Sequence, residues 1–280
     1  MALWHGVLLM VLRGGCSSVA ENLQRYAQRG GKTVILLNMA GVLLQVVSAP
    51  MDAVAYSVAP QSMLAPVGMV GLLFNLVAAQ RVHGDALSRR DIGATALVVA
   101  GTVTCLLTGA ASDDGAAAPD TSTMTAYGMI LAGIIACLAS ILFALREVGG
   151  WPDALTNAVL GGLIGSTTVV ASKVISAALS APEANAISIV LSFVPIAIAA
   201  PTHLYVLNRG FGRHSLVFMS PVGGAAGLLA NVATGFTLYG EVPEYPAQFG
   251  AGVALLCAGV LSFCAYKPAA SAGREELKGH

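Results

Sequence analysis

The residues best suited to chemistry in this 280-residue chain are polar side chains that lie inside long apolar segments. Two of them are carboxylates, Glu21 and Asp52. The others carry phenol, hydroxyl or amide oxygens, namely Tyr56, Ser62, Asn75 and Asn231. Carboxylate and amide oxygens are the ligands that hard cations prefer. We therefore expect Asp52 to bind a cation at the mouth of a path through the protein, with Asn75 and Asn231 as oxygen donors midway along it.

Each of these three residues also has a simpler interpretation. Asn75 and Asn231 could form hydrogen bonds between helices, which stabilise by about 0.6–2 kcal/mol each. Asp52 lies close to the end of its apolar segment, where it could be an ordinary solvated acid. Both interpretations stay open at the level of the sequence.

Two basic residues, Arg13 and Lys173, also lie inside apolar segments. A charge in hydrocarbon is costly, so such a residue usually faces a partner or a water-filled cavity. Arg13 could approach Glu21, two turns further along its own helix. Lys173 could neutralise Asp52 or Glu21 and be displaced when a cation binds. Alternatively, both basic side chains could extend to the membrane interface.

The elements that must position these residues are predicted by composition. The chain is 56% hydrophobic and only 10% charged, with a mean hydropathy of +0.77, whereas soluble domains carry about 25% charged residues. Its apolar residues form about nine blocks of roughly 20 residues, the length that crosses a bilayer. Because every backbone amide in lipid needs an internal partner, we expect these blocks to be helices of an all-α polytopic membrane protein. They cover residues 3–23, 34–56, 62–80, 92–109, 124–145, 154–179, 187–207, 215–238 and 247–266.

The basic residues predict the orientation of these segments. Twelve of the fourteen lie in alternate connections or in the C-terminal tail: Arg25, Arg29, Lys32, Arg81, Arg89, Arg90, Arg146, Arg209, Arg213, Lys267, Arg274 and Lys278. The remaining connections carry acids instead: Asp52, Asp113, Asp114, Asp120, Glu183, Glu241 and Glu244. Since cytoplasmic loops are rich in Lys and Arg, the N-terminus is predicted outside or luminal and the C-terminus cytoplasmic. The membrane could be the plasma membrane or an endosomal or vacuolar one.

The first apolar segment could instead be a cleaved signal peptide. However, it lacks a basic n-region, and Arg13 interrupts its apolar run. Its removal would also place Arg25, Arg29 and Lys32 outside. We therefore expect it to be a membrane span.

Several other functions are disfavoured by the sequence. A net charge of zero does not suggest nucleic acid as a partner, and the absence of a P-loop argues against an ATP-driven pump. The cysteines show no metal or disulfide spacing and are interpreted as packing residues; they are Cys16, Cys105, Cys137, Cys257 and Cys264. The histidines are scattered, so we expect neither an enzyme nor a cofactor; they are His5, His83, His203, His214 and His280. A membrane scaffold without transport activity is the remaining alternative.

An internal repeat relates the two halves of the chain. The pattern Pro-Val-Gly, Asn, Gly-acid and Gly occurs at 66–101 and again at 221–259, with an offset of 155 to 158 residues. It predicts a first repeat of four helices over 1–123, a second of five over 124–266, and a cytoplasmic tail over 267–280. Asp85 and Glu241 are corresponding acids in this pattern, and we expect each to cap or pair with a neighbouring helix start. Repeated halves are typical of secondary transporters, whose solute path runs along the repeat interface.

Prolines and glycines indicate where helices break and where they approach closely. Proline cannot donate a ladder hydrogen bond, so we expect helix breaks at Pro60, Pro66 and Pro221 whose freed carbonyls line a cavity. The pairs Gly161/Gly165 and Gly223/Gly227 allow helices to pack closely. These positions would bring polar residues of the two halves together along one transport path. The residues predicted to line this path are Arg13, Glu21, Asp52, Tyr56, Ser62, Asn75, Lys173 and Asn231.

The joint spacing of these motifs resembles that of the NIPA-type magnesium transporters, which belong to the drug/metabolite transporter superfamily. The resemblance covers about residues 5–266. Its first half lies in the run Ala55 to Pro60, then Pro66, Gly68, Asp85, Ile92-Gly93 and Gly101. Its second half lies in Gly165, Lys173, Leu207-Asn208-Arg209, Pro221 and Glu241, and its start in Asn22 to Arg25. It implies about nine helices and divalent-cation transport. One departure is that Ala49 replaces the family's acid and Asp52 the Asn one turn later.

The function expected on this resemblance is transport of magnesium or a related divalent cation, with Mg²⁺ as the substrate and not a cofactor. The alternative is an organic-metabolite carrier of the same superfamily, of nucleotide-sugar or amino-acid type, in which Arg13 and Lys173 bind an anionic substrate. Side chains of both residues facing the cavity would favour the alternative. The expected partners are the lipid bilayer, the cation and, as a homodimer, a second copy of the chain.

Overall fold

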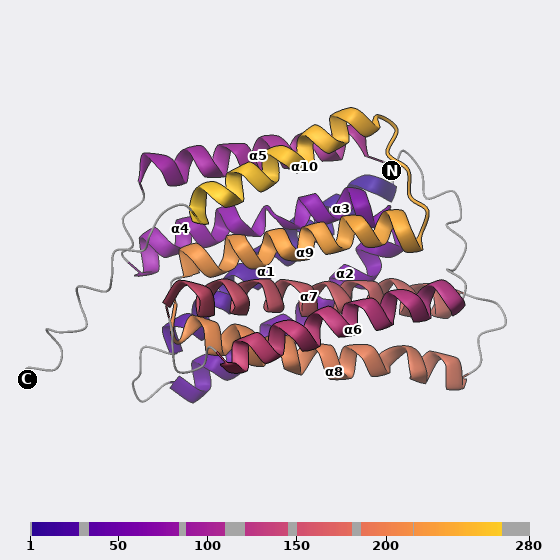
Figure 1. Ribbon diagram of the computed structural model, residues 1–280, viewed down its shortest axis with the longest axis horizontal. Helices are drawn as coiled ribbons and strands as arrows, with labels where there is room; N and C mark the ends of the chain where they lie inside the picture. Colours follow the sequence, from indigo (N-terminus) through magenta and orange to yellow (C-terminus); the bar gives the residue numbers. More distant parts are fainter. Residues whose placement is uncertain are drawn as a thin grey trace, which may run out of the picture.

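The computed structural model describes residues 2–27, 34–83, 88–109, 121–144, 150–180, 186–214 and 216–264. Nearly all of these residues lie in α-helices, and no strand occurs among them. Figure 1 shows the helices running along one common direction as a bundle, with successive long helices antiparallel. In chain order they are α1 (Ala2–Ala27), α2 (Val34–Val58), α3 (Gln61–Gly68), α4 (Gly71–His83), α5 (Arg89–Thr108), α6 (Thr121–Ala144), α7 (Gly150–Ser180), α8 (Ala186–Phe211), α9 (Leu216–Leu238) and α10 (Pro246–Cys264).

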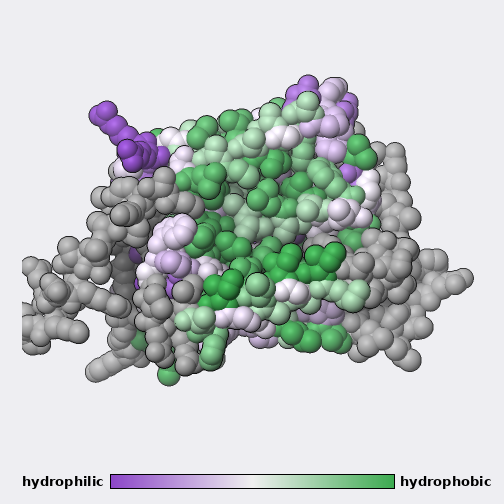
Figure 2. Space-filling model, viewed as in Figure 1, coloured by the Kyte–Doolittle hydropathy of each residue, from purple (hydrophilic) through white to green (hydrophobic). Residues whose placement is uncertain are grey.

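The outside of the bundle is apolar, as expected for a membrane protein. Large hydrophobic side chains such as Ile35, Leu36 and Leu107 are about 70% exposed, and Figure 2 shows hydrophobic residues across the middle of one face with hydrophilic ones toward its ends. Within the described residues, six helical stretches are long and apolar enough to cross a membrane, and two shorter apolar helices accompany them. The protein is therefore an all-α polytopic membrane protein. The six stretches are 3–27, 34–58, 61–82, 89–108, 150–175 and 218–238.

The third predicted segment is interrupted, and the reason is local. Pro60 precedes α3 with φ −57° and ψ 140°, and Pro66 inside α3 cannot donate to the carbonyl of Ser62. The backbone then tightens, because Met69 and Val70 donate to the carbonyls three residues earlier, and α4 begins at Gly71. The Thr102 hydroxyl of α5 donates to the Pro66 carbonyl at 3.2 Å. The expected break after Pro66 is present.

The break expected at Pro221 is absent. Pro221 lies inside α9, which continues from Leu216 to Leu238. It is the sixth residue of the helix, so its missing N–H removes only one ladder hydrogen bond near the start. The halves therefore differ, with a broken segment in the first and a continuous helix in the second.

Glycines allow the closest helix contacts. A Cβ on Gly162 of α7 would collide with the Gly223 carbonyl of α9 and lie 2.9 Å from the Gly227 nitrogen. The close approach expected at Gly223 and Gly227 is thus present. Gly161 and Gly165 also allow close packing, since a Cβ there would lie 3.1 Å from Leu207 and 3.0 Å from His203 of α8. Elsewhere α1 packs on α2 and on α4, α5 on α10, and α7 on α8.

We predict that Gly162→Val strongly destabilises the protein. Overfilling a close-packed site costs about 1–3 kcal/mol, and here the obstacle is backbone that cannot move aside. The melting temperature of the detergent-solubilised protein should fall by several degrees. The matched control is Gly93→Val, because a Cβ at Gly93 meets nothing within 4 Å. Equal melting temperatures for the two variants would contradict the close α7–α9 contact.

Candidate functional site

A cavity of about 340 Å³ lies inside the bundle, among α1, α2, α3, α4, α7, α8 and α9. Much of its lining is apolar or glycine, but it also contains carboxylates, a guanidinium and several amides and hydroxyls. The charged and polar residues that line it are Arg13, Ser17, Ser18, Glu21, Gln45, Asp52, Tyr56, Asn75, Ser166, Thr168, Ser172, His203, Ser220 and Asn231.

Helical spacing places the charged residues on the faces that line this cavity. Arg13, Ser17 and Glu21 follow one another at intervals of four on α1, so they form one stripe. On α2, Asp52 and Tyr56 are separated by the same interval and are both buried. These two faces oppose each other because α1 and α2 pack together.

The first polar contact in the cavity is an ion pair between Arg13 and Asp52. The Arg13 Nε and the Asp52 Oδ2 are 3.0 Å apart, and their side chains are 30% and 7% exposed. The second carboxylate oxygen of Asp52, Oδ1, is buried and has no hydrogen-bond partner within the described part of the chain. The sequence suggested that Arg13 would pair with Glu21 on its own helix. In the structure Arg13 instead pairs with Asp52 on α2.

The second polar cluster surrounds Glu21. The Asn75 Nδ2 donates to Glu21 Oε2 and to the Ser220 Oγ, both at 2.7 Å. The Asn75 Oδ1 accepts from the Ser18 Oγ at 2.6 Å and from the Asn22 Nδ2 at 3.0 Å. This cluster joins α1, α4 and α9, so Asn75 makes the interhelical hydrogen bonds of the simpler interpretation while also lining the cavity.

Asn231 also joins helices. Its backbone carbonyl and its Oδ1 each lie 3.3 Å from the Gln61 Nε2, at the start of α3. Gln61 is fully buried and Asn231 is 8% exposed. Like Asn75, Asn231 therefore lines the cavity and bridges helices at the same time.

A buried carboxylate closes the bundle beside Asn231. Glu241, in the connection between α9 and α10, accepts hydrogen bonds from the backbone N–H groups of Gln61 and Ser62 at 2.8 and 2.6 Å. The Lys173 Nζ lies 2.6 Å from Glu241 Oε1 and 4.2 Å from the centre of the Tyr239 ring. The Glu241 carboxylate thus caps the start of α3, where backbone N–H groups have no partner within the helix. We call Glu241, Lys173, Tyr239 and the N–H groups of Gln61 and Ser62 the Glu241 clamp.

The clamp accounts for two predicted path residues that do not line the cavity. Ser62 donates its backbone N–H to Glu241, and Lys173 pairs with Glu241 instead of Asp52 or Glu21. Gly240, just before Glu241, has a φ of +61°, which glycine adopts without strain. The corresponding acid of the first half, Asp85, lies outside the described residues.

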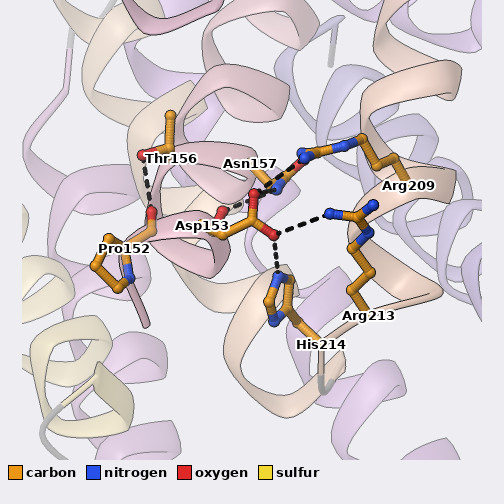
Figure 3. A network of polar contacts seen from close by, with 7 residues as sticks. All are labelled: Pro152, Asp153, Thr156, Asn157, Arg209, Arg213 and His214. Carbon is orange, nitrogen blue, oxygen red and sulfur yellow. Dashed lines mark hydrogen bonds and ion pairs between the residues drawn. The ribbon is translucent and has the colours of Figure 1, made fainter. Parts of the chain in front are cut away.

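A third buried carboxylate, Asp153, was not singled out from the sequence. Figure 3 shows Arg209, Arg213 and His214 converging on Asp153 near the start of α7. The Arg209 Nη2 and the His214 Nε2 lie 3.1 and 2.9 Å from its carboxylate oxygens, and the Arg213 Nη1 lies 3.7 Å away. Arg209 also donates to the Asn157 Oδ1 at 2.8 Å. The sequence did carry a signal for this site, since Asp153 is followed one turn later by Asn157 at the start of an apolar segment.

The structure thus brings six of the eight predicted path residues to one cavity and places the other two in the Glu241 clamp. The six are Arg13, Glu21, Asp52, Tyr56, Asn75 and Asn231. Within the described parts of the chain, no three acidic, His or Cys side chains gather into a site that could hold a metal ion. Any cation in the cavity would therefore use few carboxylates.

The fold and this cavity define a polytopic helical membrane protein with a carboxylate-lined cavity inside its bundle. The family model described as Magnesium transporter NIPA matches residues 4–243, so the chain belongs to this family. The family is one of transporters and not a class of enzymes. Searches of curated proteins and of solved structures gave no match.

We predict that Glu241→Gln destabilises the protein, because it leaves the Lys173 ammonium without its carboxylate in a buried place. Breaking a buried ion pair from one side costs about 3–5 kcal/mol. The melting temperature in detergent should therefore fall by several degrees. The double variant Glu241→Gln/Lys173→Met should recover part of this loss.

Glu244→Gln is the matched control for this prediction, since Glu244 is exposed in the same connection. A single variant as stable as the control would show that the clamp is not stabilising. A double variant no more stable than the single one would show that the two charges are not coupled.

The clamp also predicts an acid dependence of stability. Burial raises the pKa of Glu241, but the Lys173 ammonium and hydrogen bonding from Ser62 outweigh it, so the pKa lies below its ordinary value of 4.5. Because this pKa is lower in the folded than in the unfolded state, Glu241 stabilises the folded protein fully above pH 4.5. This stabilisation is lost as the pH falls through the folded-state pKa. Melting temperatures measured from pH 7 to pH 3.5 should fall less steeply in Glu241→Gln than in the natural protein. Parallel curves would contradict the assignment.

Proposed function

We propose that this protein transports Mg²⁺ or a related divalent cation through the cavity between α1, α2, α4, α7, α8 and α9. The observation that carries the proposal is the charge inside the membrane-spanning bundle. Two carboxylates, Asp52 and Glu21, line the cavity with a single guanidinium, that of Arg13. Membership of the family supports the same substrate.

The cavity suits the coordination chemistry of Mg²⁺. This ion gives up its water slowly and is commonly held by one or two carboxylates while keeping several waters. A volume of about 340 Å³ is enough for several water molecules. The ion could therefore enter partly hydrated, with Asp52 as its first carboxylate and water, Tyr56 and amide oxygens completing the shell.

The two carboxylates form successive stations along the path. Glu21 lies eight residues beyond Arg13 on α1, about 12 Å along the helix axis, and Arg13 marks the position of Asp52. Asn75 and Ser220 hold Glu21 in place through hydrogen bonds. A cation released by Asp52 would next meet Glu21.

We also propose nine membrane crossings, with α3 and α4 forming one crossing and the N-terminus outside. This is supported by the alternating helix directions and by the basic residues of the described parts, which flank connections at one end of the bundle. These residues are Arg25, Arg81, Arg89, Arg90, Arg209 and Arg213. The connection between α9 and α10, which contains Glu241 and Glu244, lies at the other end in Figure 1.

The two halves would then be inverted repeats over 1–123 and 124–266. Support comes from matching contacts, since α1 packs on α2 and α4 as α7 packs on α8 and α9. The equivalent helices α1 and α7 run in opposite directions in Figure 1. In this arrangement α6 has no counterpart, which agrees with a helix missing near the start of the first half.

The organic-anion alternative has less support. It expects Arg13 and Lys173 to face the cavity together, but Lys173 pairs with Glu241 and only Arg13 lines the cavity. One guanidinium against two carboxylates gives the site a negative balance. Such a site attracts cations more than anions.

The test is Mg²⁺ entry into proteoliposomes that contain a Mg²⁺-sensitive dye, driven by an inside-negative potential. We expect entry above that of empty liposomes, and we expect Asp52→Asn and Glu21→Gln each to reduce it about tenfold or more, because each removes a carboxylate from the path. Glu244→Gln, which removes an exposed carboxylate outside the cavity, should transport normally.

The outcomes separate the function from its path. Folded natural protein without Mg²⁺ entry would contradict the proposed function. Entry that survives both Asp52→Asn and Glu21→Gln would keep the function and contradict the path.

A further inference from the structure

We propose that Arg13 is a tethered cation that occupies Asp52 between transport events and thereby excludes monovalent cations from the path. This inference rests on the proposed cation transport and assigns Arg13 a role in its selectivity. It does not make Arg13 a substrate ligand, because like charges repel.

The position of Arg13 supports this role. Its guanidinium is in the cavity, with Nε 3.0 Å from Asp52 Oδ2. The side chain is 30% exposed, so part of it faces the cavity space instead of the packed core. Asp52 is almost fully buried, and neither the Arg13 Nε nor the Asp52 Oδ1 has a hydrogen-bond partner among the described residues. The contact of Arg13 with one carboxylate oxygen is therefore an ion pair, and the other oxygen receives no donor from the described residues.

Arg13 is also the sole ammonium or guanidinium among the described residues that line the cavity. The ionisable groups around it are Asp52 and Tyr56 on α2, Glu21 on its own helix and His203 on α8. The His203 Nδ1 is already bonded to the Gly161 carbonyl at 2.8 Å. Arg13 is thus the permanent positive charge against which any entering cation must compete.

The charge of the entering ion decides whether it can displace Arg13 from Asp52. Coulomb attraction to Asp52 scales with the charge of the ion, so a divalent cation gains twice what a monovalent one gains at the same distance. A monovalent ion displacing Arg13 would only replace one unit charge with another and would lose the fixed geometry of the tethered guanidinium. A divalent ion gains net attraction.

The structure also offers Arg13 a place to go when it is displaced. Ser17 and Glu21 lie on the same stripe of α1, facing the same cavity. A guanidinium leaving Asp52 can turn toward Glu21 without leaving the cavity. Without Arg13, Asp52 would be an uncovered carboxylate open to Na⁺ and K⁺.

The test makes the tethered charge titratable. In Arg13→His the side chain is charged at low pH and neutral at high pH, since imidazole has an ordinary pKa of about 6.5. Proteoliposomes with Mg²⁺-sensitive or Na⁺-sensitive dye would report the ratio of Mg²⁺ to Na⁺ entry at pH 5.5 and pH 8.5. The natural protein and Arg13→Lys, which stay charged at both values, are the controls.

We expect the natural protein and Arg13→Lys to exclude Na⁺ at both pH values. We expect Arg13→His to exclude Na⁺ at pH 5.5 and to admit it at pH 8.5, with the Mg²⁺/Na⁺ ratio falling at least tenfold. A structural role alone would not make selectivity depend on pH within one folded protein. If Arg13→His does not fold, Arg13→Gln should show the same loss of selectivity at both pH values.

The outcomes are distinguishable from those of the proposed function. Suppose that the natural protein admits Mg²⁺ but the ratio of Mg²⁺ to Na⁺ entry in Arg13→His is the same at both pH values. This result, or a ratio in Arg13→Gln equal to that of the natural protein where Arg13→His does not fold, would overturn the role of Arg13 but not the transport proposal. Absence of Mg²⁺ entry in the folded natural protein would overturn both the transport proposal and this one.

Discussion

Charges inside a lipid-embedded bundle must find partners within the protein, and the described structure follows from that constraint. The hydrocarbon core holds no water that could offset the cost of burying a carboxylate or an ammonium group. Asp52 pairs with Arg13, Glu241 with Lys173 and Asp153 with Arg209. In each case the partner lies on a different element of the chain. The charges therefore act as tertiary contacts that fix which helices lie next to one another.

The same constraint separates charges that hold the structure from charges available for function. Glu241 is nearly surrounded by donors, namely two backbone N–H groups and Lys173. Among the described residues Asp52 has one charged partner and one oxygen without a donor, and it faces a cavity. A carboxylate such as Glu241, which already accepts from three donors, has little remaining capacity for a ligand. Carboxylates with an open oxygen beside a cavity can exchange one partner for another, which is what a transport site requires.

Much of the fold could be predicted from the sequence. Blocks of about 20 apolar residues must be helical in lipid, and the described part of each predicted block is helical to within one residue of its ends, except for the turn at Met69 and Val70 between α3 and α4. Glycine spacing predicted the contact at Gly223 and Gly227, and motif spacing predicted the family. The loss of helix continuity after Pro66 but not at Pro221 was not predictable from proline alone. It depends on the tightened turn at Met69 and Val70.

The partners of the charged residues could not be predicted, because pairing depends on how helices rotate against each other. Helical spacing along α1 suggested Glu21 for Arg13, yet rotation of α1 against α2 presents Asp52. Lys173 likewise meets Glu241, which arrives from a connection 68 residues away. Polar residues within apolar blocks were enough to select six of the residues that line the cavity. Their division into ligands and structural hydrogen-bonding groups requires the tertiary structure.

We propose that a divalent cation binds inside the bundle at the Asp52 and Glu21 carboxylates. Binding of Mn²⁺, a paramagnetic substitute for Mg²⁺, to the purified protein can be followed by electron paramagnetic resonance. We expect bound Mn²⁺ that excess Mg²⁺ displaces, and we expect this binding to be lost in the double variant Asp52→Asn/Glu21→Gln but not in Glu244→Gln. If Mg²⁺-displaceable Mn²⁺ binds the folded double variant as tightly as the natural protein, the cation does not bind at these carboxylates.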